Sequence, residues 1–191
     1  MSSTSYKTIL ETTKPAINAV NQLTPVLNVK CITPVYTRKL SNKIVKRCGI
    51  ALLDKDDNVL IVKQNNYLGK WGFPKGHMEK IDEGSRSRCA AREFFEEVNI
   101  TISSLNCTIL QECCYKYIYE KNNVEITIYV LRSEKSHIDI EIKLSAELSG
   151  LKWIQYNELK KQYEKNKNHF NISIFTVIKE YIHFEMDRVL E

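Results

Sequence analysis

The sequence predicts an α/β fold in which helices pack on a mixed sheet. Two observations lead to this prediction. Apolar runs typical of strands come in pairs separated by polar turn residues, and segments with helical spacing of apolar residues stand between and after these pairs. The resulting order is strand, strand, loop, helix, three strands and two helices. Such an order is typical of a sheet covered by helices.

The first pair of strands is expected over residues 45–64, where VKRCGIALLD and NVLIVKQ lie on either side of KDD. The next segment, YLGKWGFPKGH, is rich in glycine and proline and is predicted to be a loop. A helix is predicted over residues 85–98. Ser85 suits its N-cap, and Asn99 suits a left-handed residue at its C-terminal end.

The second half of the chain continues the same alternation. CTILQECCYKYIYE and VEITIYVLR flank KNN and predict a hairpin. LSGLKWIQY predicts a further strand, followed by a helix over residues 157–167. Residues 170–190 predict a closing amphipathic helix.

The length of 191 residues suits one domain with additional residues at its ends. Residues 1–40 are expected to form an N-terminal extension. Within it residues 6–22 could make a weak helix, and Pro25 and Pro34 favour an extended arm. Residues 41–191 are expected to form the folded domain, including the last helix.

Composition narrows the class of protein. The chain is 43% hydrophobic and 27% charged, which is typical of a globular protein, and its apolar runs are too short to span a membrane. MSSTSYKTIL lacks the pattern of a secretory signal, and the six cysteines show neither a CxxC pair nor zinc-type spacing. We therefore expect a cytoplasmic protein with reduced thiols and no membrane partner.

The net charge of +5 is unevenly distributed. Residues 30–47 carry six basic side chains and no acid, and residues 151–170 carry five lysines against two glutamates. Such segments can attract a polyphosphate or an RNA backbone, although a solvated surface explains them as well.

The most informative stretch is GFPKGHMEKIDEGSRSRCAAREFFEEV, residues 72–98. Glu93, Glu96 and Glu97 share one face of the predicted helix, where three like charges repel one another. A hard divalent cation with oxygen ligands would remove this penalty, and Gly76 can bring its backbone carbonyl close to such a cation. The alternative is that these glutamates form a solvated acidic helix face without a functional role.

Arg92 precedes these acids and can pair with an acid upstream, clamping the loop to the helix. Glu83 and Asp82 are the two candidates, and the sequence leaves the choice between them open.

The stretch resembles the Nudix box, Gly-x5-Glu-x7-Arg-Glu-U-x-Glu-Glu-x-Gly-U, where U is a bulky apolar residue. It departs from the pattern in two places. The span from Gly76 to Arg92 is two residues longer, and Asn99 replaces the last glycine. The matching residues are Gly76, Arg92, Glu93, Phe94, Glu96, Glu97 and Ile100.

The resemblance implies an α/β/α sandwich of the MutT type with a mixed sheet. It also implies hydrolysis of a pyrophosphate linkage in a nucleoside diphosphate joined to another group. Mg²⁺ or Mn²⁺ would be held by Glu93, Glu96, Glu97 and Gly76. Several Nudix branches place a glutamate six residues before a strand tryptophan, as Glu147 precedes Trp153 here. The catalytic residues expected by this analogy are Glu96, Glu97, Glu147 and Arg92.

Local features favour one substrate. WGFPKG, CAARE and the Glu147–Trp153 pair look like the catalytic domain of mRNA decapping enzymes. This resemblance implies capped RNA as the partner and release of 7-methylguanosine diphosphate, with Lys75 beside the phosphates. Trp71 and Tyr117 could stack a base, although packing is the alternative for both. The residues before the first predicted strand are expected to be too few for the separate N-terminal domain of cellular decapping enzymes.

Two alternatives stay open. PKGHME also looks like the loop of diadenosine tetraphosphate hydrolases, in which His77 and Glu79 have counterparts. Diphosphoinositol polyphosphate hydrolases are related as well, so the substrate could be a small nucleotide or an inositol pyrophosphate. The third possibility is an RNA-binding protein on a catalytically inactive Nudix fold, against which the three retained glutamates argue.

Overall fold

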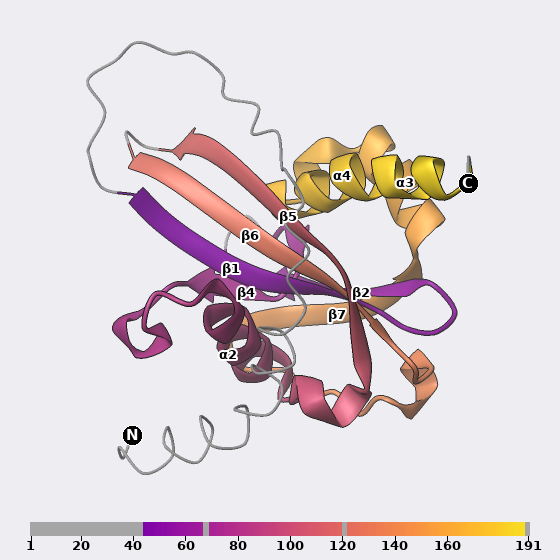
Figure 1. The fold of residues 1–191 in the computed structure, drawn as a ribbon, viewed down its shortest axis with the longest axis horizontal. Coiled ribbons are helices and arrows are strands. Elements are labelled where there is room, and N and C mark those ends of the chain that lie inside the picture. The colour runs from indigo at the N-terminus through magenta and orange to yellow at the C-terminus, as the bar shows by residue number, and fades with distance from the viewer. Residues whose placement is uncertain (1–43, 67–68, 120–121, 190–191) are drawn as a thin grey trace.

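The computed structural model describes residues 44–66, 69–119 and 122–189, with side chains described up to residue 180 in the last helix (Figure 1). The predictions for residues 1–40 lie outside these residues. Among the described helices, none combines the length and the apolar character that a membrane span requires.

Within the described residues, seven strands form one mixed sheet. The main order is β3-β2-β1-β6-β5, with β4 paired to β1 and β7 paired to β2. β1 and β6 run parallel, and the other pairs are antiparallel. The strands are β1 (Ile44–Leu53), β2 (Asn58–Gln64), β3 (Trp71–Gly72), β4 (Lys75–His77), β5 (Cys107–Tyr119), β6 (Asn122–Ser133) and β7 (Leu148–Gln155).

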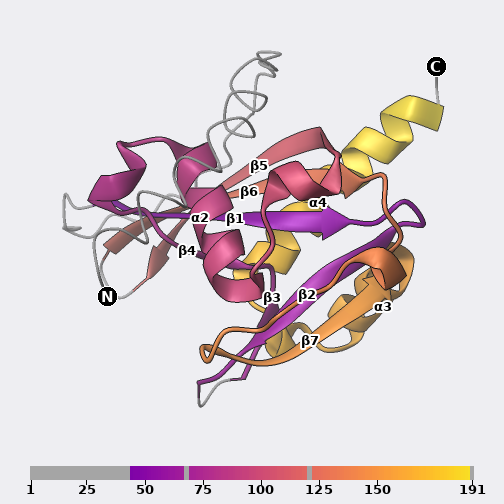
Figure 2. The same cartoon turned by 90° about the horizontal axis from the view of Figure 1, so that it is seen from below.

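Helices cover both faces of this sheet. Figures 1 and 2 show α2 on one face and both α3 and α4 on the other, so the predicted α/β/α sandwich is confirmed. The helices of the described residues are α2 (Arg86–Val98), α3 (Tyr156–Lys165) and α4 (Ile172–Val189), with 3₁₀ turns η1 (Lys80–Asp82), η2 (Ile102–Leu105), η3 (His137–Asp139) and η4 (Lys167–His169).

The two faces carry separate apolar cores. Leu52, Leu60 and Phe94 belong to the core beneath α2, whereas Ile128 and Ile174 belong to the core beneath α3 and α4. Alternate residues of each strand thus face opposite helices, which is the expected result for a sheet buried on both sides.

Helix α2 begins and ends where local chemistry predicts. The Ser85 hydroxyl accepts a hydrogen bond from the Arg88 N–H at 3.3 Å, and Asn99 adopts a left-handed conformation with φ of 57°. Asparagine tolerates this conformation better than most residues, so it can stand where the box has glycine.

The prediction of a loop before α2 is wrong in part. Trp71–Gly72 and Lys75–His77 are short strands. Each short strand is stabilised by pairing with a longer strand. β3 pairs with β2. β4 pairs with β1 through Arg47–His77, Cys48–Gly76 and Gly49–Lys75. Glycine and proline disfavour strands locally, but ladder bonds to these neighbours stabilise the extended backbone.

The sheet opens between β1 and β2. These strands pair only at Leu53 and Val59, next to the turn that joins them. Further along, β4 lies beside β1 and β7 lies beside β2. The candidate site draws its residues from both sides of this opening.

Candidate active site

A cavity of about 420 Å³ is lined by residues of β1, β2, β4, α2 and the loop before β7. Its lining contains five glutamates, one arginine and one lysine, so acids predominate. A polyphosphate would be repelled from such a cavity unless cations entered with it. The lining residues are Arg47, Gln64, Lys75, Gly76, His77, Glu79, Glu93, Glu96, Glu97 and Glu147.

Arg92 holds the acidic helix in place. Its Nε and Nη2 donate to the two carboxylate oxygens of Asp82, both at 3.0 Å, and Nη2 also donates to the His77 carbonyl at 2.9 Å. Its Nη1 donates to Glu93 and to Glu96, each at 2.9 Å. Burial opposes the charge of Arg92, but these acids raise its pKa above the ordinary value.

The expected clamp between Arg92 and Glu83 is not formed. Asp82 makes that ion pair and is 2% exposed, whereas Glu83 pairs with Arg88 at the surface. Asp82 stands six residues after Gly76, which is the loop spacing of the box, so the two extra residues follow it. Glu83 and Gly84 both have positive φ and accommodate this insertion before the helix starts.

Gly76 and Glu93 are in close contact. A methyl group at Gly76 would lie 2.0 Å from the Glu93 Oε2 atom, so only glycine leaves space for this carboxylate. Burial raises the pKa of Glu93 to about 7, although Arg92 opposes the shift. Because Gly76 has no side chain, the Glu93 carboxylate can lie against the Gly76 backbone.

Glu97 is the most buried of the three acids. It is 5% exposed, and its buried Oε2 atom has no hydrogen-bond partner among the described residues. Burial raises the pKa of Glu97 to about 8, against the opposing field of Lys75. An unpartnered buried carboxylate oxygen is costly in a stable fold, and a bound cation would satisfy it.

These residues fit a hard divalent cation. Carboxylate and carbonyl oxygens are the ligands that Mg²⁺ and Mn²⁺ prefer. Within the described part of the chain, no three acidic, histidine or cysteine side chains are already assembled as a ligand set. Arg92 forms ion pairs with both Glu93 and Glu96. Glu96 has 40% of its side chain exposed and is the least confined of the three acids.

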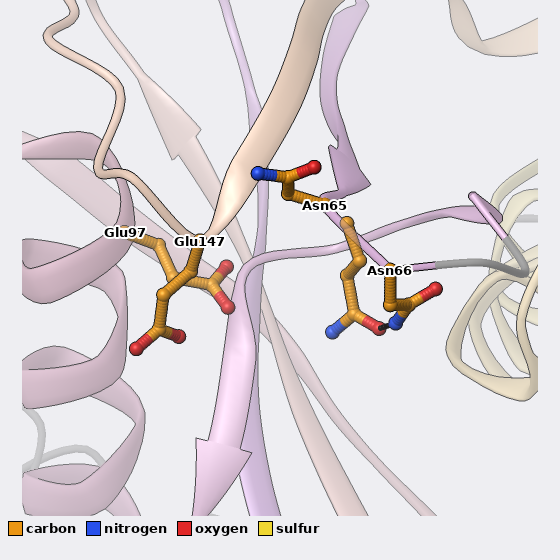
Figure 3. Close-up of a pocket in the computed structure, with 5 residues that line it drawn as sticks. Asn65, Asn66, Glu97 and Glu147 are labelled. Carbon is orange, nitrogen blue, oxygen red and sulfur yellow. Dashed lines mark hydrogen bonds between the residues drawn. The ribbon is translucent and has the colours of Figure 1, made fainter.

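Glu147 lies in the same cavity as Glu97 although 50 positions separate them in the sequence. Figure 3 shows their carboxylates near each other, one from α2 and one from the loop before β7. The charge of Glu147 contributes to the raised pKa of Glu97. Lys75 and His77 also line this cavity, and Lys75 is only 7% exposed, with its pKa lowered by burial.

Trp71 and Tyr117 do not line the cavity, in contrast to the expectation that they contact substrate. Trp71 packs against the core beneath α3 and α4, and the Lys152 ammonium lies 4.7 Å from the centre of its ring. Tyr117 stacks on Tyr115 with ring centres 6.0 Å apart, on the same side of the sheet. Both aromatics make packing contacts, which is the alternative that the sequence left open, and substrate contact by either one stays a prediction.

Sequence reasoning missed several lining residues. In the sequence Arg47 belongs to a basic segment, but β1–β4 pairing places it opposite His77, to whose Nε2 it donates at 3.1 Å. Gln64, Asn65 and Asn66 belong to no recognisable motif. They line an adjoining pocket of about 280 Å³ with Glu97 and Glu147 (Figure 3). A polar run directly after an apolar strand was the available signal.

Comparisons with known proteins agree with this geometry. The bis(5'-nucleosyl)-tetraphosphatase [asymmetrical] of Sus scrofa is 28% identical over 123 residues, covering 60% of this chain and 81% of that protein. An Ap4A hydrolase of C. elegans, solved as a binary complex, has a similar fold with a TM-score of 0.58 at 19% identity. That similarity covers 75% of this chain and 98% of that chain.

The fold is shared with other enzymes as well. A bifunctional NMN adenylyltransferase/ADP ribose pyrophosphatase of Francisella tularensis gives a TM-score of 0.57 at 16% identity, over 75% of this chain and 42% of that chain. Most directly, the family model of the NUDIX domain matches residues 43–173. The chain therefore belongs to the Nudix family and is a hydrolase of phosphorus anhydrides.

Proposed function

We propose that this enzyme hydrolyses dinucleoside polyphosphates, using Mg²⁺ or Mn²⁺ bound by Glu93, Glu96, Glu97 and the Gly76 carbonyl. The observation that carries the proposal is the cavity in which these acids lie beside Arg47 and Lys75. A relative that covers 60% of this chain is a bis(5'-nucleosyl)-tetraphosphatase, which favours this substrate class over the other candidates.

Several of the lining residues have a distinct role in this proposal. When bound, the divalent cation would neutralise phosphate oxygens and polarise the phosphorus under attack. Arg47 and Lys75 bind the remaining phosphate oxygens, since no other basic residue except His77 lines the described cavity. Glu147 accepts the proton of the attacking water, because it lies in the cavity and is not held by Arg92.

Capped RNA is the second candidate. The position of Glu147 beside Glu97 favours it, because the Glu147–Trp153 pair is part of the resemblance to decapping enzymes. Chemically the two candidates are close, since a cap is also two nucleosides joined through phosphates. Inositol pyrophosphates share the anhydride but lack a nucleoside.

Product analysis separates these substrates. Wild type and Glu97→Gln are incubated with diadenosine tetraphosphate, cap-labelled RNA and a diphosphoinositol polyphosphate, each with Mg²⁺ and with Mn²⁺. We expect wild type to cleave diadenosine tetraphosphate with the highest kcat/KM, and the variant to be nearly inactive. Preferential release of 7-methylguanosine diphosphate would replace the proposal by decapping. Failure to cleave any substrate would support an inactive binding protein.

A further inference from the structure

The opposite ends of the combined cavity differ in chemistry. Arg47, Lys75 and His77 lie at one end. Gln64, Asn65 and Asn66 lie at the other, where none of the five described lining residues is cationic. Gln64, Glu97 and Glu147 line both pockets and connect them. A bound nucleotide would therefore meet cations at one end and neutral amides at the other.

Phosphates are disfavoured at the amide end. The amides carry no charge and no cationic side chain stands among the described lining residues there, whereas Arg47 and Lys75 line the larger pocket and attract phosphates (Figure 3). Amides nevertheless make good hydrogen bonds, since each offers a donor and an acceptor. The uncharged part of a nucleotide with such groups on its edge is the base.

The amides are oriented by the protein. Asn65 Nδ2 donates to the Ala146 carbonyl at 3.3 Å, which directs the amide. Gln64 Oε1 accepts from Asn66 Nδ2 at 3.2 Å. In the described part of the chain, Asn65 Oδ1 and Gln64 Nε2 then have no hydrogen-bond partner. One acceptor and one donor are thus left available on adjacent residues.

The backbone fixes this arrangement beside the Glu147 loop. The Asn65 N–H donates to the Glu147 carbonyl at 2.7 Å. The Ser149 hydroxyl lies 3.3 Å from the carbonyl oxygens of Lys63 and Gln64. The strand pairing of β2 with β7 shifts register between Lys63 and Gln64, which turns the following residues out of the ladder. Such preorganisation lowers the entropy cost of binding.

We propose that Gln64 and Asn65 form a subsite for an adenine base. Adenine carries an amino donor and ring-nitrogen acceptors on its edges, the kinds of group that pair with the acceptor Asn65 Oδ1 and the donor Gln64 Nε2. Hypoxanthine differs by a carbonyl acceptor in place of the amino group. This inference rests on the proposed function for its substrate, and it adds the base and the residues that select it.

The test compares diadenosine with diinosine tetraphosphate at saturating Mn²⁺. In wild type we expect kcat/KM to favour the adenine substrate by about tenfold, the value of one lost hydrogen bond. Asn65→Ala should reduce this preference to near unity, chiefly through KM. Gln64→Glu replaces the donor by an acceptor with nearly the same shape and should also lower the preference. Gln162→Ala, an amide on α3 outside the cavity, is the matched control and should keep the wild-type ratio.

Binding of the mononucleotides separates the subsite from the proposed activity. Calorimetry measures AMP and IMP against wild type and Asn65→Ala with Mn²⁺ present, and circular dichroism checks that the variant is folded. If neither tetraphosphate is cleaved, the proposed function fails, but tighter binding of AMP than IMP that is lost in Asn65→Ala still supports the subsite. Equal affinity of wild type for AMP and IMP, no binding of AMP, or an unchanged preference in folded Asn65→Ala would overturn it.

Discussion

Asp82 and Arg92 form a buried two-point ion pair that joins the turn after β4 to helix α2, with both N–O distances at 3.0 Å. Their side chains are 2% and 10% exposed. Because Arg92 also contacts Glu93 and Glu96, this pair connects the loop geometry to the position of the proposed metal ligands. Loss of the Asp82 charge removes the most deeply buried partner of Arg92, so this contact should be sensitive to mutation.

The first prediction compares Asp82→Asn with Glu83→Gln. Asp82→Asn should lower the free energy of unfolding by about 3 kcal/mol, because Arg92 keeps its charge but loses a buried partner. Glu83→Gln removes a surface ion pair at the neighbouring position and should change it by less than about 1 kcal/mol. Urea titration followed by circular dichroism measures both. Equal losses in the two variants would contradict the assignment of Asp82 to the clamp.

The second prediction concerns Gly76. Gly76→Ala places a methyl group against the Glu93 carboxylate, which must move. Mn²⁺ affinity should fall by about tenfold or more, with a small change in stability because the carboxylate is on a flexible side chain. Gly84→Ala is the control. A methyl group at Gly84 would have no neighbouring atom within 4 Å, but the backbone φ of 77° disfavours any residue other than glycine. This substitution should cost about 1 kcal/mol of stability and leave Mn²⁺ affinity unchanged.

The third prediction separates a general base from a metal ligand. If Glu147 accepts the proton of the attacking water, Glu147→Gln should lower kcat by about a hundredfold without changing Mn²⁺ affinity. Steady-state kinetics and Mn²⁺ titration of the same preparation give both quantities. A parallel loss of Mn²⁺ affinity would make Glu147 a ligand, and full activity would exclude both roles.

The fourth prediction is a pH dependence of stability at Asp54, in the turn between β1 and β2. Asp54 is fully buried and accepts hydrogen bonds from the backbone N–H groups of Asp56, Asn58 and His137. Burial opposes its ionisation, but hydrogen bonds from Asn58 and His137 lower its pKa to about 2 from 3.8. The ionised form is favoured by folding, so the stabilisation is present above pH 3.8 and lost as pH falls towards 2.

Asp54→Asn should therefore be less stable than wild type by about 2 kcal/mol at pH 6, and the difference should shrink below pH 4. Urea titrations between pH 2.5 and 6 measure this. Asp56→Asn, an exposed acid in the same turn, is the control and should show a difference of less than about 0.5 kcal/mol throughout. A constant difference between wild type and Asp54→Asn down to pH 2.5 would contradict the prediction.

Local chemistry explains which features the sequence predicts well. Ser85 and Asn99 mark the ends of α2 because capping depends on residues a few positions apart. The choice between Asp82 and Glu83 could not be made locally. This choice depends on the backbone conformation of the two-residue insertion. The positive φ of Glu83 and Gly84 directs the Glu83 side chain away from that of Asp82.

Long-range pairing explains what the sequence does not predict. Arg47 enters the cavity because β1 pairs with β4 across 30 positions, and the short strands β3 and β4 depend on the same kind of contact. Tyr117 could have faced either a ligand or a helix, and the placement of α3 and α4 on its side of the sheet decides this. Neither relationship has a signal within one segment of the sequence.

Mn²⁺ binding tests the central claim most directly, which is that Glu93, Glu96 and Glu97 hold a divalent cation in this cavity. Electron paramagnetic resonance of free Mn²⁺ is measured during titration into wild type and into Glu97→Gln. We predict that wild type binds Mn²⁺ and that the variant, which stays folded, binds at least about tenfold more weakly because a charged oxygen ligand is lost. Equal affinity in the two proteins, or no binding to wild type, would contradict the claim.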